Sequence, residues 1–284
     1  MKTKNLLLTG LLCLTPPLLT TARALAAQID ADEIMTRSAI AYDSKDLFSR
    51  ISFSFAQAGT AGKRITLYMA FKDYHGKHGI SSKIIMFNQF PPDKKDISFL
   101  AWLYAPKTHK KDDMWLYLPA LRTIRKMNHQ DHHMQHDDKD KDAFSLSDLK
   151  RFELQKRDPQ LDQHQLVGRE QVGTHETFKI ISTPKDPSSS PYGKTVSWIT
   201  TDNYLPVQIE YFDHQGGRAK RQTIQWTAQN HAWVWKKLSA VNLKTGHHTI
   251  LEQTDVKVNS GLPDRIFTKR FMKRGAGTLA AQIR

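Results

Sequence analysis

Cysteine is almost absent from this sequence of 284 residues, because Cys13 is the only one. It lies inside an N-terminal apolar run, so the remainder of the chain contains no thiol. This excludes thiol catalysis, structural disulfides and cysteine-ligated zinc from the body of the protein. The fold must therefore be stabilised by its core alone, which a chain of this length can supply.

Long apolar runs are also scarce. A basic start precedes an apolar run over residues 6–19, which is shorter than the ~20 residues of a membrane-spanning helix. A small-x-small cleavage pattern follows and ends at Ala26. We therefore predict that residues 1–26 are an export signal, cleaved between Ala26 and Ala27, and that residues 27–284 form a single domain.

Recognisable catalytic motifs are missing. The sequence has no G-x-S-x-G nucleophile elbow and no H-E-x-x-H zinc motif. Residues 191–195, Pro-Tyr-Gly-Lys-Thr, partly match the end of a phosphate-binding loop motif. However, Ser188 stands where that loop requires its first glycine, and the residues that follow have a strand pattern. We expect that the protein is not an enzyme.

Positive charge is in excess, with 42 Lys and Arg against 28 Asp and Glu and a net charge of +14. Such a chain favours anionic partners, and the export signal argues against nucleic acid. Arg122, Arg125 and Lys126 form a basic cluster that we expect to face lipid headgroups or a transiently bound anionic membrane surface. Each such residue near a membrane contributes about 1 kcal/mol. The alternative is an ordinary solvated strand face.

A histidine-rich stretch interrupts the pattern over residues 128–143. Its four histidines combine with aspartates in a set that can ligate zinc, copper or nickel. The candidate ligands are His129, His132, His133 and His136. The stretch has no periodicity and resembles no closed structural site, so the alternative is a flexible loop with adventitious metal affinity. We expect no resident cofactor.

The hydrophobic pattern predicts one amphipathic helix over residues 32–46 and a short helical turn over residues 144–149. Elsewhere the pattern alternates, as in strands. The predicted strands cover residues 51–55, 65–71, 80–90, 97–104, 115–118, 121–127, 151–157, 164–172, 175–183, 194–200, 207–211, 218–226, 233–241 and 247–258. Short turns between them predict an antiparallel meander, which forms one large curved sheet. Such a sheet must close or be covered on its concave face.

Several sequence blocks resemble the LolA-like family of outer-membrane lipoprotein-sorting proteins, which are often encoded beside exporters of the RND type. The blocks are Trp-Leu-Tyr-Leu-Pro-Ala-Leu-Arg at 115–122, Phe-Ser-Leu-Ser-Asp-Leu at 144–149 and Tyr-Leu-Pro at 204–206. The resemblance implies a mainly β fold, an incomplete antiparallel β-barrel with helices that cover an apolar concave face. It also implies a periplasmic carrier of lipids or lipoproteins that works with an inner-membrane exporter. The histidine-rich stretch replaces a short Gly- and Ser-containing loop of the relatives.

The alternating runs supply candidate residues for an acyl-chain cavity. They are Phe53, Phe55, Leu67, Met69, Phe71, Trp102, Tyr104, Trp115, Tyr117, Ile209 and Tyr211. The alternative for each is a purely structural role in packing the helix against the sheet. Two other functions remain open at this point. One is an envelope lipid sensor that acts through a protein partner, and the other is a periplasmic metal-binding protein that uses the stretch from His129 to His136.

Overall fold

The computed structural model describes residues 29–56, 62–127, 147–149, 153 and 157–282. Most of these residues belong to strands. The strands are β1 Asp46–Ala56, β2 Arg64–Asp73, β3 Ile80–Phe90, β4 Ser98–Tyr104, β5 Asp113–Leu118, β6 Thr123–Met127, β7 Asp162–Val172, β8 His175–Pro184, β9 Lys194–Thr200, β10 Pro206–Phe212, β11 Arg218–Gln229, β12 Ala232–Asn242 and β13 His248–Val258.

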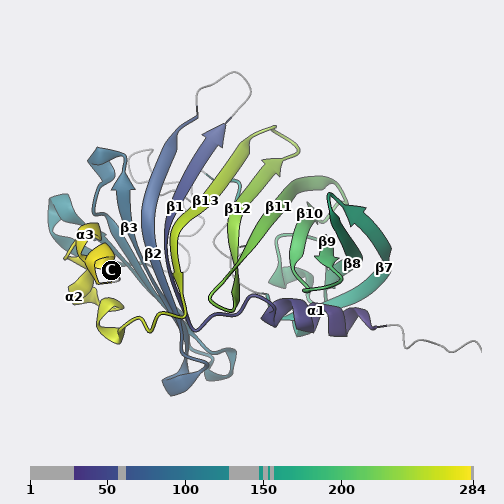
Figure 1. The fold of residues 1–284 in the computed structure, drawn as a ribbon, viewed down its shortest axis with the longest axis horizontal. Coiled ribbons are helices and arrows are strands. Elements are labelled where there is room, and N and C mark those ends of the chain that lie inside the picture. Colours follow the sequence, from purple (N-terminus) through teal and green to yellow (C-terminus); the bar gives the residue numbers. More distant parts are fainter. Residues whose placement is uncertain (1–28, 57–61, 128–146, 150–152, 154–156, 283–284) are drawn as a thin grey trace, which may run out of the picture.

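All thirteen strands form one sheet in the order β6-β5-β4-β3-β2-β1-β13-β12-β11-β10-β9-β8-β7. Every neighbouring pair is antiparallel, and the pairing of β1 with β13 joins the first half of the chain to the second. Figure 1 shows that the sheet curls strongly toward β7, while β6 and β7 remain its two open edges. The predicted fold class, a mainly β protein with a curved and incompletely closed antiparallel sheet, is confirmed.

The first helix is shorter than the sequence predicts. Helix α1 spans Ala31–Ile40 and buries Ala31, Ile34 and Ser38. Strand β1 then begins at Asp46, the residue at which the predicted helix ended. Asp46 is 3% exposed and its carboxylate accepts hydrogen bonds from a distant turn, so a tertiary contact decides its conformation rather than the local pattern. Figure 1 shows α1 lying across the lower ends of the strands near β7.

The region before β7 also differs from the prediction of a strand over residues 151–157. Its two described residues lie outside the strands, Glu153 in a 3-10 turn and Arg157 in an irregular segment. The side chain of Glu153 reaches inward to Lys220, whereas the exposed Arg157 pairs with Asp162. In the predicted helical turn, the described residues 147–149 form a bend.

A C-terminal segment that the hydrophobic pattern did not predict crosses one face of β2 to β5. It contains the 3-10 turn η9 Asp264–Ile266 and the helices α2 Lys269–Met272 and α3 Ala276–Ala281. The indole of Trp102 donates to the carbonyl of Phe267 at 3.0 Å and thereby fixes the segment to β4. None of the described helices is long and apolar enough to span a membrane.

Candidate functional site

The two faces of the sheet carry different apolar clusters. Side chains that neighbour each other along a strand point to opposite faces. Ala70 and Ile85 therefore lie on the face under the C-terminal segment, where they pack with Phe267 and Phe271. Their strand neighbours Met69 and Met86 pack against a second cluster on the opposite face, which we call the inner face.

The inner-face cluster draws on strands from both halves of the chain. Its buried members are Ile51, Phe53, Phe55, Ile65, Leu67, Leu149, Ile224, Leu238, Ala240 and Leu251. The strand register extends the inner face toward β8, because Ile209 pairs with Ser197, which pairs with Ile180. Ile180 packs against Ile34 of α1. Helix α1 therefore covers the inner face near β7 to β9.

Leu149 covers the middle of the inner face, although it belongs to no strand or helix. It is fully buried. Its neighbour Asp148 anchors the bend to β13: the Asp148 amide donates to Thr249 Oγ1 at 3.0 Å, and Thr249 Oγ1 donates to the Asp148 carboxylate at 3.1 Å. His247 Nδ1 also contacts that carboxylate. A short polar anchor thus holds one leucine on a large apolar surface.

A second anchor lies beside it. The ammonium group of Lys220 pairs with the carboxylate of Glu153 and donates to the carbonyl of Asp148 at 3.0 Å. The hydroxyl of Tyr192 donates to Glu153 at 2.5 Å. Burial, and then the neighbouring Glu153, raises the pKa of Tyr192 well above its ordinary value. The phenol therefore stays protonated and remains a donor to this carboxylate.

One polar atom on the inner face has no partner among the described residues. Gln253, which pairs with Ile51 across β13 and β1, is 4% exposed. Its side-chain amide donates to Ser49 Oγ at 2.7 Å, but its Oε1 atom accepts no hydrogen bond in the described structure. A buried acceptor without a donor costs about 1–3 kcal/mol. A ligand that offers a donor here recovers this free energy.

The structure divides the predicted cavity residues between the two faces. Phe53, Phe55 and Leu67 are buried in the inner-face cluster, and Met69 and Ile209 pack against it. Trp115 and Tyr117 are buried on the other face of the sheet, in the cluster under the C-terminal segment. Trp102 packs against that cluster.

The other three predicted cavity residues have different surroundings. The hydroxyl of Tyr211 donates to Gln222 at 2.9 Å, and its ring lies 4.8 Å from that of Tyr192. Tyr104 donates to Asp113 at 2.8 Å. Phe71 is partly exposed. The alternation identified apolar strand residues but not the face on which each lies.

The predicted basic residues are all exposed. Arg122 follows the turn between β5 and β6, whereas Arg125 and Lys126 lie on the edge strand β6. Lys126 pairs with Asp113 at 2.7 Å, and this contact lowers the pKa of Asp113 to about 2. The four predicted histidine ligands, His129, His132, His133 and His136, lie outside the described residues. Within the described residues, no group of three or more His, Asp or Glu side chains is arranged to hold a metal.

A small cavity of about 280 Å³ lies beside the start of α1. It is lined by Ile29, Asp30, Ala31, His164 and Leu166. His164 uses both ring nitrogens, with Ser182 Oγ at 2.8 Å and the Pro159 carbonyl at 2.9 Å. The cavity is smaller than the roughly 300–1,000 Å³ of ligand pockets, and both ring nitrogens of its histidine already have partners. The inner face is therefore the better candidate site.

Sequence reasoning missed the polar residues of the inner face. Lys220, Gln222 and Gln253 are buried, but in the sequence they look like the solvated positions of their strands. The strand register places Lys220 opposite Tyr211 and close to Tyr192, but the sequence alone does not show this pairing. Nothing in the local sequence points to Gln253.

Three solved structures are similar to this chain over most of its length. A crystal structure described as an outer membrane lipoprotein-sorting protein domain from Vibrio parahaemolyticus has a TM-score of 0.70 at 21% identity, covering 86% of this chain and 98% of that one. A DUF1329 family protein from Desulfovibrio piger has a TM-score of 0.72 at 21% identity, covering 85% and 97%. A LolA superfamily protein from Nitrosomonas europaea has a TM-score of 0.60 at 15% identity, covering 86% and 100%.

Sequence comparison adds a family but no function. No curated protein matches this chain significantly. A family model that is described as an uncharacterized protein matches residues 81–274, which is more than half of the sequence. The matched region begins in β3 and ends just after α2, so it includes five of the ten buried members of the inner-face cluster and the C-terminal segment as far as α2. The chain therefore belongs to this family of uncharacterized proteins, and its fold is that of the LolA superfamily.

Proposed function

We propose that the protein is a periplasmic carrier that binds the acyl chains of a lipid or lipoprotein on the inner face of the sheet. The observation that carries this proposal is the inner-face cluster, on which, among the described residues outside the strands, Leu149 packs from an anchored bend. An acyl chain that takes the place of Leu149 gains about 0.8 kcal/mol for each methylene group it buries. The proposed role involves binding and transport without a chemical step.

The chemistry of the inner face supports a cargo with both apolar and polar parts. Aliphatic and aromatic side chains from β1, β2 and β11 to β13 suit acyl chains. The free acceptor of Gln253 suits a hydroxyl or amide donor in the polar part of the same molecule. A predicted export signal and the fold shared with a lipoprotein-sorting domain support a periplasmic location. The proposal that the carrier works with an inner-membrane exporter of the RND type rests on the sequence resemblance to the LolA-like family.

Native mass spectrometry of the protein purified gently from periplasm, with lipid extraction of the same sample, tests the proposal. We expect one acylated molecule bound per chain. An unliganded mass that does not change after addition of phospholipid or acylated peptide would contradict the proposal.

A pair of matched variants tests which face carries the cargo. Leu149 and Leu100 are both fully buried, the first on the inner face and the second under the C-terminal segment. Each change to Ala destabilises the fold by about 2–5 kcal/mol. We expect Leu149→Ala to increase the fraction of protein that carries added phospholipid, and Leu100→Ala to leave it unchanged. An increase in bound phospholipid for Leu100→Ala but not for Leu149→Ala would place the binding site on the face under the C-terminal segment.

A further inference from the structure

Two turns lie together at one end of strands β3 to β6. The 3-10 turn η2 Pro92–Lys94 connects β3 to β4, and η4 Pro119–Leu121 connects β5 to β6. Ser98, at the start of β4, pairs with Phe87 on one side and Tyr117 on the other. Both turns are therefore at the same end of the sheet. With about 4.8 Å between adjacent strands, they are separated by roughly 10 Å.

Each of these turns exposes a large apolar side chain to solvent. Phe90, the last residue of β3, is 46% exposed, and Leu121 of η4 is 59% exposed. Neither belongs to an apolar cluster of the described residues. A single exposed apolar side chain is ordinary, but two on adjacent turns with cations around them indicate an interaction surface.

The C-terminal segment brings more cations to the same end. Ser98 Oγ donates to the carbonyl of Met272 at 3.0 Å, and the amide of Ala276 donates to the Asp96 carboxylate of the β3–β4 turn at 2.9 Å. Lys273 and Arg274 lie between these two contacts and are exposed. Figure 1 shows α2 and α3 beside the strands of this half of the sheet.

Lys95 and Arg122 add one exposed cation from each turn. Within the described residues, none of Lys95, Arg122, Lys273 and Arg274 forms an ion pair. Asp93 is the exposed carboxylate on the same turn as Lys95. Asp96 of that turn is a second carboxylate, so these four cations and two carboxylates give a net charge of about +2. We define the docking end as Phe90, Lys95, Leu121, Arg122, Lys273 and Arg274.

We propose that the docking end binds the surface of an anionic phospholipid bilayer. Cations near such a surface are attracted to the lipid phosphates, and exposed apolar side chains enter the boundary between headgroups and acyl chains. An acidic protein surface would attract the same cations, but it would gain little from Phe90 and Leu121. The inference deepens the proposed function by naming the surface that meets the membrane, although docking itself requires no cargo.

Sedimentation of the purified protein with vesicles tests the proposal. We expect binding to phosphatidylcholine vesicles that contain phosphatidylglycerol, little binding to pure phosphatidylcholine, and a marked loss in 0.5 M salt. Lys273→Gln with Arg274→Gln should weaken binding roughly 30-fold, because each cation is worth about fivefold. Leu121→Ser should weaken it about tenfold.

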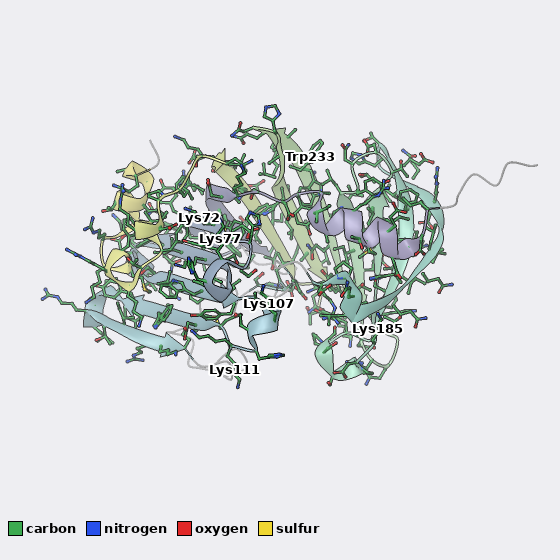
Figure 2. The ribbon with its side chains drawn as sticks, turned by 90° about the horizontal axis from the view of Figure 1, so that it is seen from below. Lys72, Lys77, Lys107, Lys111, Lys185 and Trp233 are labelled. Atoms are coloured by element: carbon green, nitrogen blue, oxygen red, sulfur yellow. The ribbon has the colours of Figure 1, made fainter. Side chains whose placement is uncertain are left out.

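The control removes the same charge from the other end of the sheet. Lys107 and Lys111, labelled in Figure 2, are exposed residues of the turn between β4 and β5. We expect Lys107→Gln with Lys111→Gln to weaken vesicle binding less than threefold. An equal loss in both double variants would attribute binding to net charge and overturn the assignment.

The remaining outcomes separate this proposal from the proposed function. Unchanged vesicle binding of Leu121→Ser, beside a loss in the Lys273 and Arg274 variant, would show that Leu121 does not enter the bilayer and would overturn the docking end as defined. A wild-type protein that binds no anionic vesicle would also overturn docking. The acyl-binding proposal would stand in that case, because its test is the mass of the bound lipid.

Discussion

Lys220 and Glu153 form an ion pair inside the molecule, with side chains that are only 5% and 1% exposed. Glu153 lies in the segment before β7, and Lys220 lies on β11. The pair therefore fixes that segment against the inner face. Lys220 also lies 4.6 Å from the ring centre of Tyr211, so its charge has an aromatic neighbour as well as a carboxylate.

The first prediction concerns this pair. Lys220→Met should lower the free energy of unfolding by about 3–5 kcal/mol, because Glu153 would stay buried without its cation. Lys220→Met combined with Glu153→Leu should lose less than the single variant, since no isolated charge remains. Urea denaturation of wild type, both single variants and the double variant measures the coupling. Additive losses would show that the two side chains do not interact.

The second prediction concerns Asp46, which holds the C-terminal segment. Its two carboxylate oxygens accept from the amides of Ser260 at 2.8 Å and Gly261 at 2.9 Å. Asp46→Ala removes these acceptors, so we expect a loss of about 1–3 kcal/mol and faster proteolysis after residue 258. Limited proteolysis with mass spectrometry locates the first cut. Asp213→Ala, at an exposed hairpin turn, is the control and should leave that site protected.

The sequence predicts the strands well and the covering elements poorly. Strand β3 was predicted at its observed bounds, because an apolar run over residues 84–87 lies at its centre and Pro91 follows its last residue. Helices α2 and α3 were missed, since they have four and six residues and, in α2, two cations precede the apolar pair. Short helices such as these depend on packing rather than on their own propensity.

The candidate site is less visible in the sequence for a related reason. Leu149 belongs to a recognisable block, but its place is fixed by contacts of Asp148 with Thr249 and His247, about a hundred residues later. Likewise, Phe53 and Trp102 have the same alternating context and yet lie on opposite faces. Alternation gives the period of a strand but not the direction of its apolar face.

The third prediction concerns acid stability. Hydrogen bonding from Lys126, together with Tyr104 and Lys110, lowers the pKa of Asp113 from 3.8 to about 2 in the folded protein. The carboxylate therefore stabilises the fold above pH 3.8, and its contribution is lost as the pH falls toward 2. Asp113→Asn lacks this contribution at every pH. We expect the difference in Tm between wild type and variant to shrink from pH 6 to pH 2.5, measured by circular dichroism.

A difference in Tm that stays constant over this range would contradict the assigned role of Asp113. Asp112→Asn is the matched control, because the Asp112 carboxylate accepts from the backbone amide of Tyr104 at 2.9 Å and has no cationic partner in the described structure. Its difference from wild type should not follow the titration of Asp113. The comparison separates the charge of one residue from the general acid sensitivity of the turn.

The last prediction concerns Gln253, whose buried Oε1 atom accepts no hydrogen bond among the described residues. Gln253→Met keeps a similar volume and removes both the unsatisfied acceptor and the hydrogen bond to Ser49 Oγ. The first change stabilises the fold and the second destabilises it, so the free energy of unfolding without ligand should change by less than about 1 kcal/mol. If the cargo donates a hydrogen bond to Oε1, the same variant should bind acylated peptide roughly tenfold more weakly.

Gln222→Met is the control on the same face, because the oxygen of Gln222 already accepts from Tyr211 at 2.9 Å. This control should lose stability by leaving the Tyr211 hydroxyl unpaired, while its affinity for the peptide stays within threefold of wild type. Equal affinities of wild type and Gln253→Met would show that the cargo makes no hydrogen bond at this position.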